Sequence, residues 1–135
     1  MLLDLDSIIY YGRDYSCYEH KYENYWWLDL IDYDIYSVDQ LISDMGFESY
    51  DEICDSVYYI PLFKTDIVAV EKKFMADYDS KKLARIEKEC PSYDAAFMTY
   101  IERERIEWRW FEYERAALYN DAVLWCKENN IAYRK

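Results

Sequence analysis

Only two glycines and two prolines occur in this chain of 135 residues, and this scarcity limits the folds it can adopt more than any other feature. Tight hairpin turns and long loops depend on these two residue types, so a sandwich or barrel of many short strands is not expected. Apolar residues make up 53% of the chain, far more than a disordered protein contains. A chain of this length can bury a core without metals or disulfides. We therefore expect residues 1–135 to form a single, helix-rich domain.

The second half of the chain has the clearest periodicity, with apolar residues three and four positions apart from residue 65 onward. This spacing predicts helices over residues 66–77, 80–90, 92–103 and 106–129. Asn129 and Asn130 can adopt the left-handed backbone that ends a helix, after which the chain is expected to fold back. The stripe of the last helix consists of Trp110, Phe111, Tyr113, Ala117, Leu118, Ala122 and Trp125.

The first half carries the strand signals. Residues 25–31 are rich in strand-forming side chains, and residues 35–38 form a return strand after a candidate turn, Asp32-Tyr33-Asp34. Short helices are expected at 4–11, from a Ser37 or Asp39 cap to Met45, and at 49–57. Tyr15, Tyr18, Tyr22 and Tyr25 have the spacing of an aromatic helical stripe, and residues 58–62 are predicted to be an extended connector. The expected fold is α+β and mostly α, with a small N-terminal hairpin or sheet packed on a helical C-terminal half.

Negative charge is concentrated in the same first half. The chain has 28 acidic and 16 basic side chains, which gives a formal net charge of −12. Residues 61–135 are charge-neutral, with 14 of each kind, whereas residues 1–60 hold 14 acids against Arg13 and Lys21 alone. Eleven of the 17 tyrosines also lie in the acidic segment. Rings of this size contribute to cores or interfaces, so the segment is interpreted as a folded surface and not as a tail.

Two interpretations of this acidic surface remain open. The acids could simply keep a tyrosine-rich core in solution. They could instead imitate a nucleic-acid backbone, because duplex DNA carries one charge per about 1.7 Å of axis and its protein partners present rows of Lys and Arg. The candidate partner-binding residues are Asp29, Asp32, Tyr33, Asp34, Tyr36, Asp39, Asp44, Glu48, Asp51, Glu52 and Asp55.

Motifs for catalysis and cofactor binding are not found in the sequence. His20 is the only histidine, and two glycines, Gly12 and Gly46, cannot form a glycine-rich phosphate loop. Cys17 and His20 could share a helix face, but two ligands without a second pair do not make a zinc site. We therefore expect no enzymatic activity, no cofactor and no metal. Direct binding of nucleic acid is not expected either, because it normally requires a basic balance.

The chain also lacks signals for export or membrane insertion. Its first residues include Asp4 and Asp6 where a signal peptide would carry lysine or arginine, and no run of about 18 apolar residues occurs. The sequence therefore predicts a cytoplasmic protein without a membrane span. Its four cysteines are widely separated and match no zinc or redox motif.

The C-terminal pattern resembles a bacterial family of uncharacterised proteins, number one-fifty-eight in the uncharacterised series. The connector Tyr59-Ile60-Pro61-Leu62 and the strand Trp27-Leu28-Asp29 are also similar to segments of that family. Where its members usually carry Phe-Arg-Arg-Phe, this chain has Asp94-Ala95-Ala96-Phe97. Because the family has no assigned activity, the resemblance implies a scaffold that has become more acidic, and no function. The residues that match its C-terminal signature are Trp110, Phe111, Tyr113, Ala117, Leu118, Ala122, Trp125, Asn129 and Ile131.

Three functions are compatible with these observations. The first is a non-enzymatic protein-binding inhibitor, an acidic nucleic-acid mimic that blocks a basic nucleic-acid-binding protein in the manner of phage anti-CRISPR or anti-restriction proteins. The second is a housekeeping small-ligand or nucleotide-binding domain, which would need a concave site where the hairpin meets the last two helices. The third is an antitoxin-like partner of a basic toxin. Exposed tyrosines would also allow a homodimer.

Overall fold

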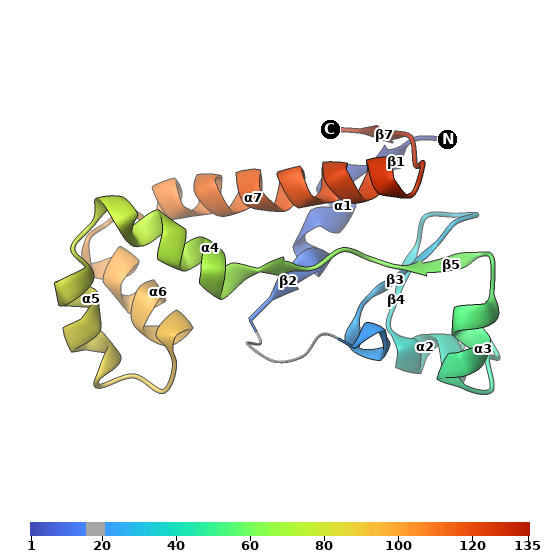
Figure 1. Ribbon diagram of the computed structural model, residues 1–135, viewed down its shortest axis with the longest axis horizontal. Helices are drawn as coiled ribbons and strands as arrows, with labels where there is room; N and C mark the ends of the chain where they lie inside the picture. The colour runs from blue at the N-terminus through green and yellow to red at the C-terminus, as the bar shows by residue number, and fades with distance from the viewer. Residues whose placement is uncertain (16–20) are drawn as a thin grey trace.

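Short strands and helices alternate through the first half of the chain, and the longer helices follow (Figure 1). The computed structural model describes residues 1–15 and 21–135. The fold is α+β and mostly α, as the sequence predicts. In the first half the elements are β1 (Leu3–Asp4), α1 (Leu5–Ile8), η1 (Ile9–Gly12), β2 (Arg13–Asp14), η2 (Tyr22–Asn24), β3 (Trp27–Asp29), β4 (Ile35–Tyr36), α2 (Val38–Ser43), α3 (Tyr50–Asp55) and β5 (Tyr59–Pro61). In the second half they are β6 (Thr65–Asp66), α4 (Ile67–Phe74), η3 (Met75–Asp77), α5 (Ser80–Glu87), α6 (Tyr93–Arg103), α7 (Glu107–Glu128) and β7 (Tyr133–Arg134).

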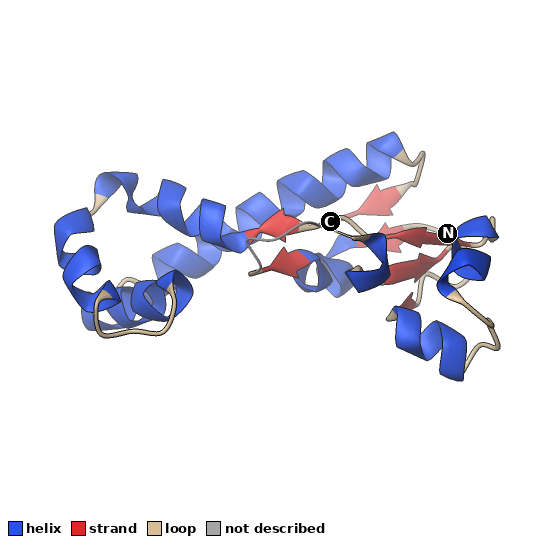
Figure 2. Cartoon of the chain, turned by 60° about the horizontal axis from the view of Figure 1, so that its bottom comes forward, coloured by secondary structure: helices blue, strands red, loops and turns tan. Residues whose placement is uncertain are grey.

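The strands form small sheets that join distant parts of the chain. The hairpin β3–β4 is antiparallel, and β5 pairs with the other edge of β3, which gives the order β4-β3-β5. Two parallel pairs, β1 with β7 and β2 with β6, connect the first residues to the second half. Figure 2 shows the strands gathered between helices α4 to α6 at one end and α2 and α3 at the other.

One expectation about helical segments is wrong, and the segment expected to be an extended connector is extended but also paired. The predicted connector at 58–62 contains strand β5, which bonds to β3 through register pairs such as Leu28 with Ile60. Pro61 is tolerated because it ends an edge strand, where its missing N–H leaves no ladder bond unmade. The expected tyrosine stripe is not a helix at Tyr22 and Tyr25, where only the single 3-10 turn η2 forms. Tyr15 follows strand β2, and Tyr18 lies outside the described residues.

Local capping explains why the helices begin where they do. At α2, the Ser37 hydroxyl accepts from the Gln40 backbone N–H at 3.1 Å, and the Gln40 side chain accepts from the Ser37 N–H at 2.8 Å. This reciprocal pair is a capping box. Ser92 and Asp66 cap α6 and α4 through single hydrogen bonds of the same kind. Helix α7 is followed by Asn130, whose φ of 56° is the left-handed conformation expected there.

Buried side chains form two separate clusters. The larger core lies among α1, α4, α6 and α7, and Phe97 and Trp110 meet at its centre with ring centroids 4.7 Å apart. Gly12 belongs to this packing, because a Cβ atom there would lie 2.2 Å from Cε2 of Phe63. The smaller cluster lies between the β4-β3-β5 sheet and helices α2 and α3. It consists of Trp27, Val38, Leu41 and Ile53, with Tyr36, Phe47, Tyr50 and Tyr59 packed against it.

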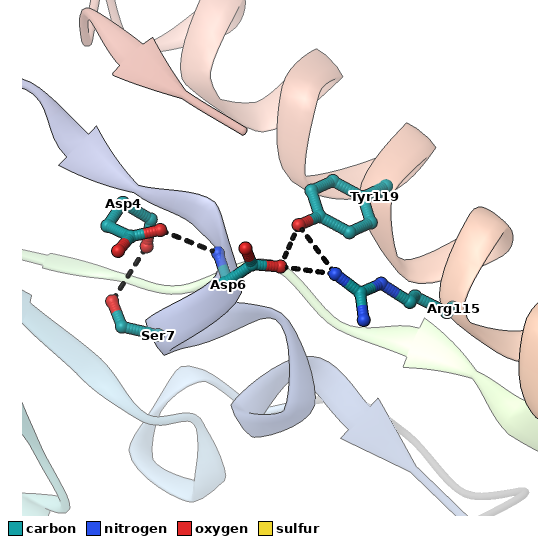
Figure 3. Close-up of polar contacts among 5 residues, drawn as sticks. All are labelled: Asp4, Asp6, Ser7, Arg115 and Tyr119. Carbon is teal, nitrogen blue, oxygen red and sulfur yellow. Dashed lines mark hydrogen bonds and ion pairs between the residues drawn. The ribbon is translucent and has the colours of Figure 1, made fainter.

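Polar contacts tie helix α1 to helix α7 (Figure 3). The Asp6 carboxylate accepts from the Arg115 guanidinium at 2.6 Å and from the Tyr119 hydroxyl. Asp4 caps α1 by accepting from the Asp6 backbone N–H at 3.1 Å, and the Ser7 hydroxyl donates to the Asp4 carbonyl at 2.7 Å. The first helix is only four residues long, and the buried side chains of Leu5 and Ile8 also anchor it in the larger core.

Candidate functional site, an acidic module

The most unusual surface of the molecule belongs to one continuous segment. From Tyr22 to Phe63 the sequence contains ten acids and no lysine, arginine or histidine. This segment folds as the β4-β3-β5 sheet with helices α2 and α3 around the smaller core. We call residues 22–63 the acidic module. Its acids hold a formal charge of −10, and the nearest bases in the sequence, Lys21 and Lys64, lie just outside its two ends.

Eight of the nine acids predicted to bind a partner are exposed on this module. They occupy the β3–β4 turn and both ends of the two short helices. Within residues 1–15 and 21–135, every lysine or arginine in an ion pair bonds to an acid outside the module. Tyr33 and Tyr36, the two predicted aromatic contacts, are half-buried. The exposed acids are Asp32, Asp34, Asp39, Asp44, Glu48, Asp51, Glu52 and Asp55.

Asp29 does not belong to this exposed set, and its assignment as a partner-binding residue is corrected here. It is 5% exposed, and its Oδ1 accepts from the backbone N–H groups of Ile31 at 2.7 Å and Asp32 at 3.3 Å. The same turn places Tyr33 at a φ of 60°. Asp29 therefore holds the hairpin turn from inside, and this is how the hairpin forms without a glycine.

Some of the exposed acids stabilise the helices that carry them. Asp39 lies in the first turn of α2, and Asp51 and Glu52 lie in the first turn of α3. A carboxylate is favourable there because the N-terminal end of a helix carries partial positive charge. Glu52 also accepts from the backbone N–H of Glu48 at 3.0 Å. These positions have a structural reason to be acidic.

Four other acids have no such reason. Asp44 is the C-cap of α2, Asp55 is the last residue of α3, and neither helix has a basic residue in its last turn. The carbonyl end of a helix disfavours negative charge. Asp32 and Asp34 lie in the hairpin turn, which likewise contains no basic residue. Asp44 accepts from the neighbouring Ser43 hydroxyl at 3.2 Å and Asp34 accepts from Tyr36, but none of the four lies at a helix end that favours negative charge, so they are the strongest candidates for contact with a partner.

Burial and nearby acids raise the pKa of several tyrosines of the module. Burial, and then the charges of Asp34, Asp29 and Asp32, raise the pKa of Tyr36. Burial, and then the charge of Asp29, raise the pKa of Tyr59. At Tyr50, burial and a hydrogen bond to Cys54 raise the pKa to about 12. These phenols therefore stay protonated at neutral pH and can donate hydrogen bonds.

The sequence analysis missed a second group of acids, which is buried beneath α4, α6 and α7. Glu71 is fully buried and neither of its oxygens has a hydrogen-bond partner among the described residues. Burial, and then Asp94 beside it, raise the pKa of Glu71 to about 9. Glu114 is also buried, but it pairs with Arg13 at 2.6 Å. The sequence did hold a signal for Glu71, which lies four residues after Ile67 and three before Phe74 on the buried face of its helix.

The described part of the chain offers no group of three or more metal-binding side chains. Cys17 and His20 lie outside the described residues. The thiols of Cys54, Cys90 and Cys126 are unpaired. Among the described helices, none combines the length and the apolar character needed to cross a bilayer.

Comparison with known proteins found no matching family model, curated protein or solved structure. The resemblance to the uncharacterised bacterial family stays a prediction. Packing gives a separate reason for part of the pattern that carries it, because Trp110, Leu118 and Trp125 are buried in the core. Tyr113 is partly exposed and packs against the ring of Phe74, with centroids 5.3 Å apart, whereas Phe111 is exposed and packing does not explain it.

Proposed function

We propose that this protein is a non-enzymatic, protein-binding inhibitor of the anti-CRISPR or anti-restriction type. Its acidic module would imitate a nucleic-acid backbone and occupy the basic nucleic-acid-binding surface of another protein. The observation that carries this proposal is the complete segregation of charge, with ten acids and no base in a segment that folds around its own small core.

A purely solubilising role explains this segregation less well. Solubility depends on net charge, and acids spread over the whole surface serve it equally well. Here the acids of residues 61–135 are balanced by equal numbers of bases, whereas the module has none. A surface of one sign creates a directional field, which steers a partner of opposite sign toward one face.

The acids at the C-terminal ends of the two short helices support the same proposal. Asp44 and Asp55 lie at helix ends where a lysine would stabilise the fold. Retaining negative charge there costs stability, on the order of 0.3–1 kcal/mol for each residue. Binding to a basic surface would offset this cost, because the carboxylates would then gain counter-charges that the module itself lacks.

The test is capture of a partner from bacterial lysate, followed by competition. Wild-type protein is immobilised at about 50 mM and about 500 mM NaCl, a range over which exposed charges become screened. The four-acid variant combines Asp32→Asn, Asp34→Asn, Asp44→Asn and Asp55→Asn. We expect the wild type to retain a basic nucleic-acid-binding protein at low salt, to release it to added duplex DNA or RNA, and to associate with it about tenfold faster than the four-acid variant.

A matched control removes four negative charges elsewhere. The scaffold variant combines Glu87→Gln, Glu89→Gln, Glu102→Gln and Glu112→Gln, all exposed in the neutral half. It should associate like the wild type if position matters, and like the four-acid variant if only net charge matters, which would contradict the proposal. Binding that does not change with salt would also contradict it. A captured basic toxin that nucleic acid does not displace would identify an antitoxin instead.

A further inference from the structure

A groove of about 430 Å³ lies where the acidic module meets helix α7. Tyr22 and Tyr25 of the η2 region form one side, and Leu124 and Glu128 of α7 form the other. The chain from Ile60 to Lys64 runs between them. The groove is therefore built by three segments that are far apart in the sequence.

The groove has an aromatic floor and exposed apolar walls. Phe63 and Trp125 lie at the floor, each 8% exposed, with ring centroids 6.2 Å apart. On the walls, Tyr22 is 57% exposed and Leu124 is 56% exposed. Exposed apolar side chains on both sides of a concave aromatic surface are typical of a site that buries part of a ligand.

The backbone at this groove is closed to an added strand. Strand β5 is an edge strand, but its last residue, Pro61, has no N–H to donate. The carbonyl of Pro61 already accepts from the Trp125 indole N–H at 3.1 Å. A partner therefore cannot extend the sheet at this point, and the groove is suited to a side chain.

The charged groups of the rim favour a cation. Lys64 is the one base of the lining; its ammonium lies 4.5 Å from the Tyr25 ring centroid and 3.9 Å from Asp14, which leaves Tyr22 as the exposed ring of the groove. Asp121 accepts from the Thr65 hydroxyl at 2.7 Å, and Glu128 is exposed. Two carboxylates next to tyrosine and tryptophan rings attract a cation through both charge and ring faces.

The chain already uses this chemistry within itself. The Arg115 guanidinium bonds to the Asp6 carboxylate and lies 5.3 Å from the Tyr119 ring centroid (Figure 3). Arg13 likewise lies 4.4 Å from the ring centroid of Tyr10 while it pairs with a buried glutamate. A planar guanidinium suits such sites better than an ammonium group, because it stacks on a ring while its edge donates to a carboxylate.

We propose that this groove binds an arginine side chain of a protein partner. The guanidinium would lie between Tyr22 and the α7 wall and donate to Glu128, with Trp125 beneath it. Trp125, Asp121 and Glu128 belong to the neutral half of the chain, so this site does not require the module to be a nucleic-acid mimic. Where both proposals hold, the groove supplies a single anchored contact next to a surface that acts through long-range charge.

Short peptides test the site without knowledge of the partner. Acetyl-Gly-Arg-Gly-amide is titrated into ¹⁵N-labelled protein, and the indole N–H resonance of Trp125 is followed by NMR. The lysine peptide keeps the charge without the planar group, and the citrulline peptide keeps the shape without the charge. We expect saturable shifts with the arginine peptide, affinity roughly threefold weaker with lysine, and no saturation with citrulline.

Variants at exposed positions locate the binding. Glu128→Gln and Tyr22→Ala should each weaken the arginine peptide several-fold, whereas the matched controls Glu112→Gln and Tyr58→Ala should bind like the wild type. Equal affinity for arginine and lysine peptides, or shifts unaffected by the groove variants, would overturn the proposal. So would methylguanidinium binding more tightly than the peptide, which would indicate a site for a small molecule. Because the acidic module is unaltered in Glu128→Gln, these results are independent of the capture experiment.

Discussion

At the scale of single residues, Glu71 is the side chain least suited to its surroundings. It lies in the core of a helical scaffold with both carboxyl oxygens unpartnered. Burying an ionised carboxylate without a partner is so unfavourable that the group keeps its proton instead. The pKa of about 9 expresses this preference for the neutral form.

Replacing Glu71 should change how stability depends on pH. The folded protein keeps the Glu71 proton up to about pH 9, whereas the unfolded chain loses it near the ordinary value of 4.5. The folded state therefore binds more protons between these values, and the free energy of unfolding should fall with rising pH by up to about 1.4 kcal/mol per pH unit. Glu71→Gln does not titrate, so it should match the wild type near pH 4.5 and exceed it increasingly toward pH 8.5.

Urea unfolding at several pH values measures this difference. Glu112→Gln, at an exposed position on α7, is the control and should follow the wild-type curve at every pH. If the curves of Glu71→Gln and the wild type stayed parallel from pH 5 to 8.5, Glu71 would not be the buried neutral acid that the structure indicates.

At the scale of elements, the β3–β4 hairpin depends on a carboxyl group for its turn. Asp29 accepts two backbone N–H groups from within the loop, and Tyr33 adopts a positive φ where glycine is more usual. The turn is consequently held by hydrogen bonds that need an oxygen acceptor at position 29. They do not need a full negative charge.

Substitutions at Asp29 can distinguish the need for an acceptor oxygen from the need for a negative charge. Asp29→Ala should destabilise the protein by about 1 kcal/mol or more, because the backbone N–H groups of Ile31 and Asp32 lose their acceptor. Asp29→Asn keeps the acceptor oxygen and should lose much less stability. It should also leave the rate of association with a captured partner unchanged. Thermal unfolding and binding kinetics measure the two effects. Slower association of Asp29→Asn, to the extent expected for an exposed acid, would show that this residue does face the partner.

The elements also show how far sequence reasoning reaches. Helices α4 to α7 were predictable because their apolar spacing and their caps, such as Ser92, are local features. Strands β1, β2, β6 and β7 were not predictable, because each has two residues and forms only against a distant partner, as Arg13 does with Thr65. Strand β5 was predicted only as an extended connector, because the residue before proline is biased away from the helical region, and its pairing with β3 depends on a distant segment.

Some features of the candidate site were likewise predictable from the sequence, and others were not. Exposure of eight acids followed from their charge, since ionised side chains are rarely buried without partners. The inward position of Asp29 depends on a turn geometry that the sequence does not display. The groove at Trp125 joins three distant segments, so no local pattern could indicate it.

At the scale of the whole molecule, charge and packing are distributed unequally. The larger core holds the neutral helical half together and includes Leu28, Leu62 and Phe63 of the acidic module, whereas the smaller core within the module has only four buried apolar side chains, next to ten acids. Mutual repulsion of like charges destabilises a compact state. The module should therefore be the less stable of the two regions under conditions where its charges are poorly screened.

Amide hydrogen exchange can compare the two regions within one sample. Raising NaCl from about 0.01 M to about 1 M shortens the screening length from roughly 30 Å to roughly 3 Å. Exchange in α2, α3 and β3 should slow markedly, while exchange in α7 should change little. In the four-acid variant the salt effect on the module should be much smaller. Equal salt effects in both regions of the wild type would show that repulsion within the module does not limit its stability.

The parallel pairing of β1 with β7 also determines how the molecule responds to a pulling force. The two strands run in the same direction, so the segment before Leu3 and the segment after Arg134 leave from opposite ends of the ladder (Figure 1). A pull on these segments loads the ladder in shear, which strains its hydrogen bonds together instead of one after another. Leu3 is anchored in the core just inside this pair. A molecular motor that unfolds proteins by pulling on either segment would therefore have to separate these two strands before the applied force reached the acidic module.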